Sequence, residues 1–188
     1  MTRIRITAAT VALGLLPLLV LVVRALRDDL GANPIEEVSH ETGQWTLRLL
    51  LATLAVTPLR RLSAWSWLAP QRRTLGLLCF AWAVLHVSTW VALDLAFDFG
   101  AVVEDVLDRP YITAGFTGFV CLVPLAVTST RAWMRRLGRR WTRLHRLVYV
   151  AAAAGVVHFL WLVKADLLEP GIYAAVLALL LAARLVRR

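Results

Sequence analysis

The sequence predicts an all-α, polytopic membrane protein: a bundle of six transmembrane helices with both termini in the cytoplasm. Three observations lead to this prediction. First, 60% of the 188 residues are hydrophobic, against about half in a soluble domain. Second, the apolar residues are concentrated in stretches of about 15–20 residues that are almost free of charge, as bilayer-spanning helices require. Third, basic and acidic residues alternate between successive connections.

The six expected spans leave only short connections, so no soluble catalytic domain fits between them. The first span has no small-residue cleavage site before Arg24, and we therefore expect a retained helix rather than a signal peptide. A turn signal at residues 31–34 separates it from the second span, and Arg73 precedes the third. Pro110 fits the first turn of the fourth span, Arg146 begins the fifth, and residues 170–171 (Pro-Gly) precede the sixth. In chain order the spans cover residues 6–23, 44–59, 74–93, 110–128, 146–163 and 171–184.

The charges divide by side of the membrane. With the N-terminus in the cytoplasm, 16 of the 21 basic residues fall on the cytoplasmic side and all 12 acidic residues on the other. Because Lys and Arg mark cytoplasmic connections, this division requires an even number of spans. The net charge of +9 therefore faces lipid head groups, and we expect no nucleic-acid partner. The cytoplasmic group is Arg3, Arg5, Arg60, Arg61, Arg72, Arg73, Arg131, Arg135, Arg136, Arg139, Arg140, Arg143, Arg146, Arg184, Arg187 and Arg188.

Two histidines lie deep in the third and fifth spans. His86 follows Arg73 by 13 residues, and His158 follows Arg146 by 12. Both spans run outward, so at 1.5 Å per residue both imidazoles lie about 18–20 Å from the cytoplasmic end. Two imidazoles at one depth on parallel helices can ligate a single iron from both faces. Since intramembrane ionisable residues are costly, we predict a shared b-type haem rather than two histidines that only bond to neighbours.

Three further side chains are weaker candidates. His145 lies 13 residues before the deeper histidine of its span, which places it on a different face of a straight helix. It is either a ligand of a second haem, which would need an irregular helix, or an interfacial histidine among arginines. Arg48, well inside the second span, either extends outward or pairs with a haem propionate. We expect His40 in a solvated outer loop.

A strongly basic and aromatic segment, residues 129–141, follows the fourth span. Most of it is typical of a positive-inside anchor. It could also bind an anionic flavin phosphate or a quinone head group near the inner surface. The sequence shows no evident internal repeat, and we expect one domain over residues 1–188.

Short motifs occur in order along almost the whole chain. Toward the C-terminus they are residues 137–141 (LGRRW), 144–149 (LHRLVY) and 158–161 (HFLW). Upstream they are 31–34 (GANP) with His40 and Thr42-Gly43, 50–53 (LLAT) with 57–59 (TPL), 72–73 (RR) with 75–77 (LGL), 109–111 (RPY) and 128–130 (TST). This set of motifs resembles the MsrQ family, formerly called YedZ.

The resemblance implies a function that composition cannot supply. It implies a haem-binding membrane subunit that takes electrons from the quinone pool, or from a cytoplasmic flavin reductase. Such a subunit delivers them to MsrP, a periplasmic molybdopterin enzyme that reduces methionine sulfoxide in proteins, so sulfoxide chemistry takes place on the partner. The resemblance further implies one or two b haems, FMN, and residence in the bacterial inner membrane. The implied haem ligands are His86, His145 and His158.

The MsrQ family also resembles the transmembrane part of ferric reductases and NADPH oxidases, which carry histidine pairs for an inner and an outer haem. Arg72 stands where an inner ligand would be expected, and no flavin or nicotinamide domain is recognisable. We expect electrons to enter near His145, pass to the haem between His86 and His158, and leave to a periplasmic partner. Two alternatives remain: a haem-free small transporter or assembly protein that uses its intramembrane histidines, and a cytochrome b anchor for a different periplasmic enzyme.

Overall fold

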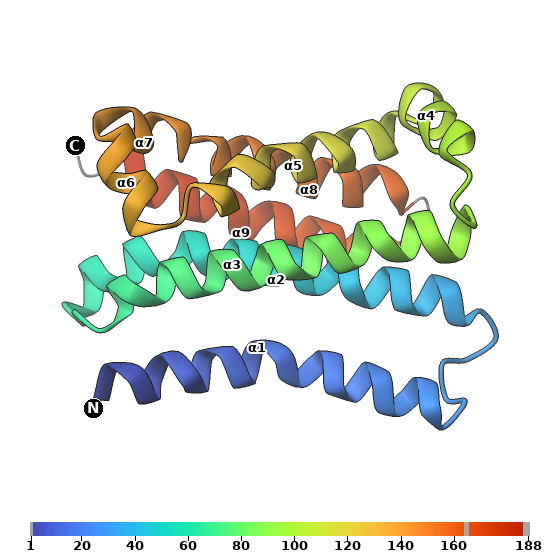
Figure 1. Ribbon diagram of the computed structural model, residues 1–188, viewed down its shortest axis with the longest axis horizontal. Helices are drawn as coiled ribbons and strands as arrows, with labels where there is room; N and C mark the ends of the chain where they lie inside the picture. The colour runs from blue at the N-terminus through green and yellow to red at the C-terminus, as the bar shows by residue number, and fades with distance from the viewer. Residues whose placement is uncertain (1, 164–165, 186–188) are drawn as a thin grey trace. The chain divides into compact units, whose positions relative to one another are not determined.

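The computed structural model describes residues 2–163 and 166–185, and every regular element in these ranges is a helix (Figure 1). The predicted all-α class is thereby confirmed. Arg187 and Arg188 of the predicted basic tail lie outside the described residues. The elements are α1 (Thr2–Leu26), α2 (Pro34–Ser63), α3 (Leu68–Thr89), the π-helical turn η1 (Trp90–Asp94), α4 (Phe99–Asp108), α5 (Pro110–Val127), α6 (Arg131–Leu137), α7 (Arg139–Leu144), α8 (Leu147–Leu162) and α9 (Leu168–Leu185).

The chain forms two compact units, Met1–Phe99 and Gly100–Arg188, each built around a pair of antiparallel helices. In unit 1, α2 packs along α3, and α1 packs mainly on α3. In unit 2, α5 packs along α8, and α9 packs on α8. The prediction of a single domain over residues 1–188 stays a prediction.

The start of α2 corrects one expectation. Asn33 caps the helix, because its side chain accepts a hydrogen bond from the N–H of Glu36 at 3.4 Å. Pro34 follows at the first helical position, where its missing N–H costs nothing. Residues 34–43, which we expected in an outer loop, therefore form the first turns of α2. His40 is exposed, as expected, but it lies on a helix.

Two polar contacts attach α1 to α3 within unit 1. The indole N–H of Trp82 donates to the main-chain oxygen of Gly14 at 2.9 Å, and Oγ1 of Thr10 donates to Oε1 of Gln71 at 2.9 Å. Trp82 is buried. In an apolar environment such contacts fix how one helix lies against another, because an unpaired polar group would be costly there.

Unit 2 depends on small residues where α5 meets α8. Gly118 on α5 lies against Ala151, Ala154 and Gly155 on α8, and a Cβ built at Gly118 would be 3.4 Å from the Ala151 carbonyl oxygen. Small residues let two helices approach closely, so van der Waals contact between the backbones replaces large side chains. The α5–α8 pair is therefore a closely packed frame for whatever its side chains carry.

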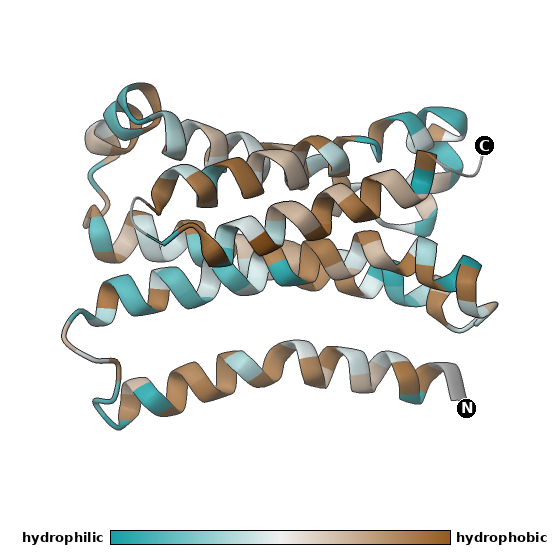
Figure 2. Ribbon diagram, turned by 180° about the vertical axis from the view of Figure 1, so that it is seen from behind, coloured by the Kyte–Doolittle hydropathy of each residue, from teal (hydrophilic) through white to brown (hydrophobic). Residues whose placement is uncertain are grey.

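Five described helices, rather than the six expected, are long and apolar enough to cross a membrane. They are Ile4–Leu26, Leu68–Asp94, Pro110–Val127, Arg139–Leu162 and Leu168–Leu185. The expected span 44–59 lies inside α2, where polar residues such as Glu41, Gln44 and Arg48 interrupt the apolar sequence. Figure 2 shows this contrast, since α1 is hydrophobic along most of its length and α2 is not. The count is corrected to five candidate spans, and the even count that placed both termini on one side loses this support.

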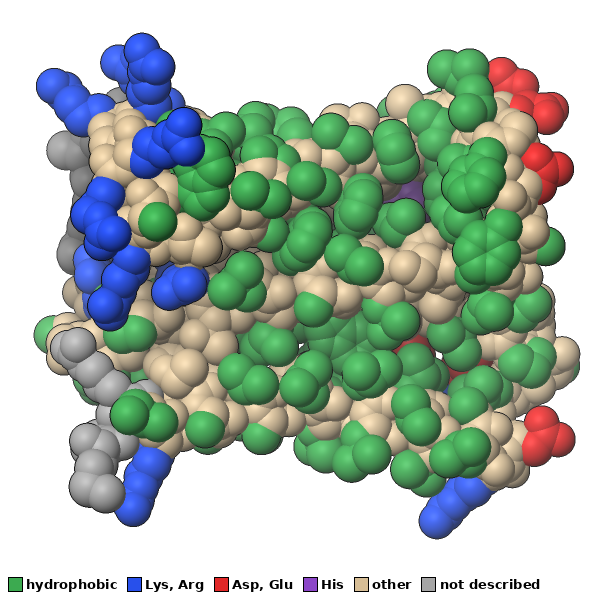
Figure 3. Space-filling view, viewed as in Figure 1, with side chains coloured by type: hydrophobic (Ala, Val, Ile, Leu, Met, Phe, Trp, Pro, Cys, Tyr) green, Lys and Arg blue, Asp and Glu red, His purple; other side chains and the backbone are tan. Residues whose placement is uncertain are grey.

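Charged side chains gather at opposite ends of unit 2. Figure 3 shows arginine side chains at the end that carries α6 and α7, and acidic side chains at the end that carries α4, with apolar side chains between them. An apolar middle with basic residues at one end is typical of a membrane-spanning helix bundle. The side of the membrane that each end faces stays a prediction.

We expect Trp82→Phe to lower the free energy of unfolding by about 1 kcal/mol, because it leaves the Gly14 carbonyl without its indole donor while keeping an aromatic ring. Thermal unfolding of the detergent-purified protein measures the change. Trp67→Phe is the control, since this indole is 40% exposed in the connection before α3. Equal midpoints for the two variants would contradict the role given to the Trp82 hydrogen bond.

Candidate functional site

His86 on α3 lies against the neighbouring helix α2. Its Nδ1 atom is 3.0 Å from the main-chain oxygen of Ser39 and 3.3 Å from Oγ1 of Thr42. The Thr42 hydroxyl donates to the carbonyl of Val38 at 2.8 Å, so it can accept a bond from Nδ1. A Cβ built at Gly43 would be only 3.0 Å from Cε1 of the ring. These acceptors assign the imidazole proton to Nδ1, which leaves the lone pair on Nε2.

His158 on α8 has the same relation to α5 in unit 2. Its Nδ1 atom is 2.7 Å from the main-chain oxygen of Tyr111. The Tyr111 ring stacks on the imidazole with centroids 6.3 Å apart. A Cβ built at Gly115 would be 2.8 Å from Nδ1 and 3.0 Å from Cγ. A carbonyl can only accept, so the proton of this imidazole is again on Nδ1 and the lone pair on Nε2.

A π-helical turn begins four residues after His86. Leu95 N–H donates to the carbonyl of Trp90 at 3.1 Å, five residues back rather than four. Single π-turns within α-helices occur frequently at functional sites. Nε1 of Trp90 is buried and has no hydrogen-bond partner among the described residues. A buried indole N–H needs an acceptor, and a bound group with an oxygen atom would supply one.

These features together fit a bis-histidine haem. A haem iron takes a neutral imidazole as axial ligand, and a carbonyl that accepts from Nδ1–H fixes the tautomer and raises the basicity of the ligating nitrogen. His86 and His158 both meet this condition. The buried Trp90 donor, one helical turn beyond His86, suits a haem carboxylate. Each unit thus supplies one histidine in the state that haem ligation needs.

His145 lies in a different setting, at the C-terminal end of α7. Its Nε2 atom is 3.1 Å from Oγ1 of Thr128, and its ring stacks on Trp141 with centroids 3.8 Å apart. The Trp141 indole donates to the main-chain oxygen of Thr128 at 2.9 Å, which closes the cluster. Between α7 and α8 the helix is interrupted at residues 145–146. The sequence argument that set His145 on a face different from that of His158 assumed a straight helix and does not apply here.

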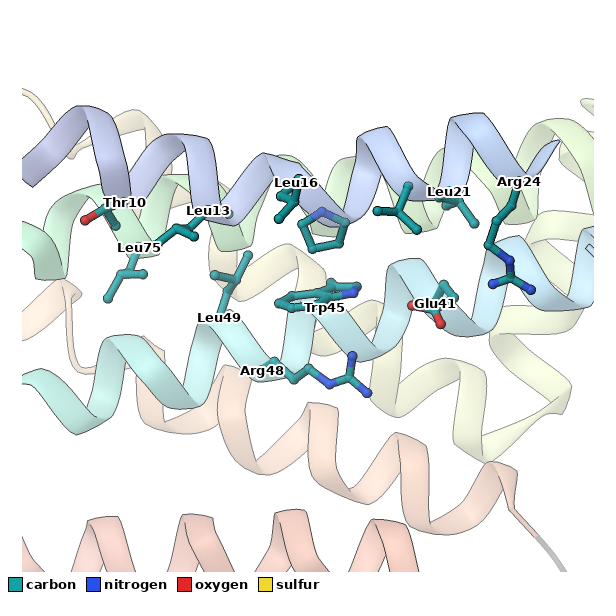
Figure 4. Close-up of a pocket in the computed structure, with 13 residues that line it drawn as sticks. Thr10, Leu13, Leu16, Leu21, Arg24, Glu41, Trp45, Arg48, Leu49 and Leu75 are labelled. Atoms are coloured by element: carbon teal, nitrogen blue, oxygen red, sulfur yellow. The ribbon is translucent and has the colours of Figure 1, made fainter. Parts of the chain in front are cut away.

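A groove of about 720 Å³ lies between α1 and α2 of unit 1 (Figure 4). Its lining is mostly apolar from Thr10 onward, and Arg24 and Glu41 stand at its other end. The 14 residues of α1 between these ends span about 21 Å at 1.5 Å per residue. Figure 4 shows Glu41 and Trp45 on the side of α2 that faces α1. This shape suits a long apolar molecule with a polar or aromatic head.

Arg48, a predicted propionate partner, also lines this groove. Its guanidinium donates to Oε1 of Gln44 and lies 5.0 Å from the centre of the Trp45 ring. A guanidinium over an indole is stabilised by the ring's negative face, particularly where water is scarce. Neither the outward extension nor the pairing with a propionate is decided by these contacts.

Sequence reasoning identified both histidines but missed the residues that hold them. Gly43 was noted only as part of a motif, and Gly115 and the main-chain carbonyls were not considered. A carbonyl leaves no signal in the sequence, because every residue has one. A glycine within an apolar helix does leave a signal, since it usually has a packing or functional reason to be there.

The fold and these sites can now be set beside known proteins. Residues 8–156 match the family described as "Ferric reductase like transmembrane component", so the chain is a protein of this transmembrane class. No solved structure matches the chain.

Within that class, the relatives share one name. A protein of Xanthomonas campestris pv. campestris (strain 8004), called protein-methionine-sulfoxide reductase heme-binding subunit MsrQ, is 52% identical over 161 residues, covering 86% of this chain and 74% of its own length. Proteins of the same name from Herminiimonas arsenicoxydans and Rhodospirillum rubrum are 50% and 51% identical, covering 91% and 92% of this chain and 80% and 83% of their own lengths. The chain belongs to the MsrQ family.

Proposed function

We propose that the chain is the haem b electron-transfer subunit of a protein-methionine-sulfoxide reductase system. The observation that carries the proposal is the matched state of His86 and His158, each with Nδ1 bonded to a main-chain carbonyl of its neighbouring helix. Their equal depth along two outward-running spans supports one shared iron. The relatives named as heme-binding subunits support the same cofactor.

In this proposal His86 and His158 hold the haem as axial ligands through Nε2. A haem held in this way supplies reversible one-electron reduction. The protein's own contribution is to fix both imidazoles as neutral ligands and to keep water from them. Trp90 Nε1–H and the Arg48 guanidinium are the donors that we assign to the haem carboxylates.

For His145 we propose a role at an inner cofactor, either a second b haem or FMN. The imidazole stacks on Trp141, and the short helices α6 and α7 beside it carry arginines in their last turns. A flavin phosphate is an anion that guanidinium groups bind well. A donor that delivers electrons from a cytoplasmic flavin reductase would arrive at this end.

The alternative donor is a quinol from the membrane, and we propose that it binds in the groove between α1 and α2. The apolar length of the groove suits an isoprenoid chain, and the Trp45 indole suits a planar ring. Glu41, in the wall of the groove, is the carboxylate placed to accept a proton as the hydroquinone is oxidised.

The partner in this proposal is an MsrP-like periplasmic molybdopterin enzyme that reduces methionine sulfoxide in oxidised proteins. The relay itself carries out no sulfoxide chemistry. Acidic residues of the connections, such as those of α4, would meet the partner, and complementary charge would speed its docking. This places the chain in the bacterial inner membrane, with its arginine-rich ends and both termini toward the cytoplasm.

The haem assignment predicts a spectral loss. We expect His86→Ala and His158→Ala each to lower the b-type reduced-minus-oxidised absorbance of the purified protein by about tenfold or more, because each removes an axial ligand. His40→Ala is the control, since this side chain is exposed on α2. A colourless parent protein expressed with ample haem would contradict the proposal and favour a haem-free transporter.

The groove assignment predicts a kinetic defect. Glu41→Gln should slow reduction of the bound haem by decylubiquinol by about 100-fold, because the amide cannot accept a proton. Stopped-flow absorbance measures the rate, and dithionite should reduce the variant and the parent alike. Glu36→Gln, in the exposed first turn of α2, is the matched control. An unchanged quinol rate in Glu41→Gln would exclude the groove as the entry site while leaving the haem relay intact.

A further inference from the structure

The two histidines are held by the same construction at the same spacing. In each unit Nδ1 bonds to the main-chain oxygen of the residue 47 positions earlier, Ser39 for His86 and Tyr111 for His158. In each unit the ring also touches the glycine 43 positions earlier, Gly43 or Gly115. The three positions of unit 1 therefore recur in unit 2 after a shift of 72 residues, a repeat that the sequence alone did not reveal.

These glycines are needed for space rather than for backbone freedom. Both lie inside helices, and neither has a positive φ. A methyl group at Gly43 would be 3.0 Å from Cε1 of His86, and one at Gly115 would be 2.8 Å from Nδ1 of His158. An imidazole is a rigid ring and cannot bend aside. At Gly14, by contrast, the nearest atom is the end of a flexible leucine side chain at 2.7 Å.

The glycine also stands beside the carbonyl that each histidine uses. Side chains four residues apart lie on one face of a helix, so position 43 is above Ser39 and position 115 is above Tyr111. A helical carbonyl has two lone pairs, of which the N–H four residues on takes one and leaves the other available. A side chain at the glycine position would stand between this lone pair and the imidazole.

We propose that Gly43 and Gly115 are positioning residues for haem ligation. Each glycine lets an imidazole approach the adjacent helix until Nδ1–H reaches a main-chain carbonyl, which fixes the tautomer and the ring plane and presents Nε2 to the iron. The inference rests on the haem ligation proposed above. It extends the site from two side chains to two matched units of histidine, carbonyl and glycine.

Gly43→Ala and Gly115→Ala test the proposal in the haem-loaded, detergent-purified full chain. Each added methyl group should weaken the bond from Nδ1, so the imidazole becomes a poorer donor to ferric iron. We expect both variants to raise the haem reduction potential and to shift or lose the low-spin bis-imidazole signal in electron paramagnetic resonance. Both should affect the same haem, since each alters one of its two ligands.

Gly76→Ala and Gly118→Ala are matched controls, one in each unit. A Cβ at Gly76 would meet only Cγ2 of Thr53 at 3.7 Å, and one at Gly118 would lie 3.4 Å from its nearest neighbour. These substitutions also replace a helical glycine with alanine, but they do not touch a histidine. Potentials and spectra of both controls should match those of the parent.

A double variant keeps the proposal testable if Gly43→Ala folds poorly. In a His86→Ala background the imidazole is gone, so the methyl group at position 43 has room. The double variant should then be at least as thermally stable as His86→Ala alone, because alanine favours the helix over glycine by about 1 kcal/mol. If it is destabilised as much as Gly43→Ala is in the parent, the ring contact is not the cause and the proposal is overturned.

The outcomes separate this inference from the haem assignment. A parent protein without histidine-dependent haem would overturn the proposed function. A parent with such haem, whose potential and spin signal are unchanged in both Gly43→Ala and Gly115→Ala, would overturn the positioning role alone.

Discussion

The hydrogen bond from a buried imidazole to the carbonyl of the adjacent helix is the interaction on which the rest of the site depends. Main-chain carbonyls in a helix are normally satisfied within that helix, so a histidine reaches one only where two helices approach very closely. In both units this approach depends on glycine at the contact. The helix pairs α2–α3 and α5–α8 are therefore the functional elements of the fold, and α1, α9 and the short helices are arranged around them.

This arrangement suits a relay because it demands little motion and little polar chemistry. An axial ligand held by a main-chain atom has few ways to rotate, so its orientation changes little when the charge on the iron changes. The chain concentrates its other polar side chains elsewhere, with a guanidinium, an indole and a carboxylate at one end of the α1–α2 groove and arginines on α6 and α7. Sites for an electron donor and for the haem can thus occupy different faces of the same helices.

The most informative error concerns α2. The span expected at 44–59 contains Gln44 and Arg48, and the helix that includes it begins ten residues earlier, at Pro34, with Glu36, Glu37 and Glu41 in its first turns. Hydropathy averaged along a chain describes lipid exposure, whereas α2 is packed along α3 and lines the groove with α1. A helix with polar work on one side and a packed neighbour on the other carries a weak transmembrane signal.

The sequence by itself determined the helical class, the separation of charges, the depth of His86 and His158, and membership of a family through motifs spread along the chain. It could do so because apolar periodicity, charge and residue type are properties of single positions. Only the tertiary structure decided which atoms hold the histidines, that helix α7 ends at His145, and that Ser39, Gly43 and His86 recur as Tyr111, Gly115 and His158. These features depend on distances between helices far apart in the chain, and the main-chain carbonyls that complete them are present at every position of any sequence.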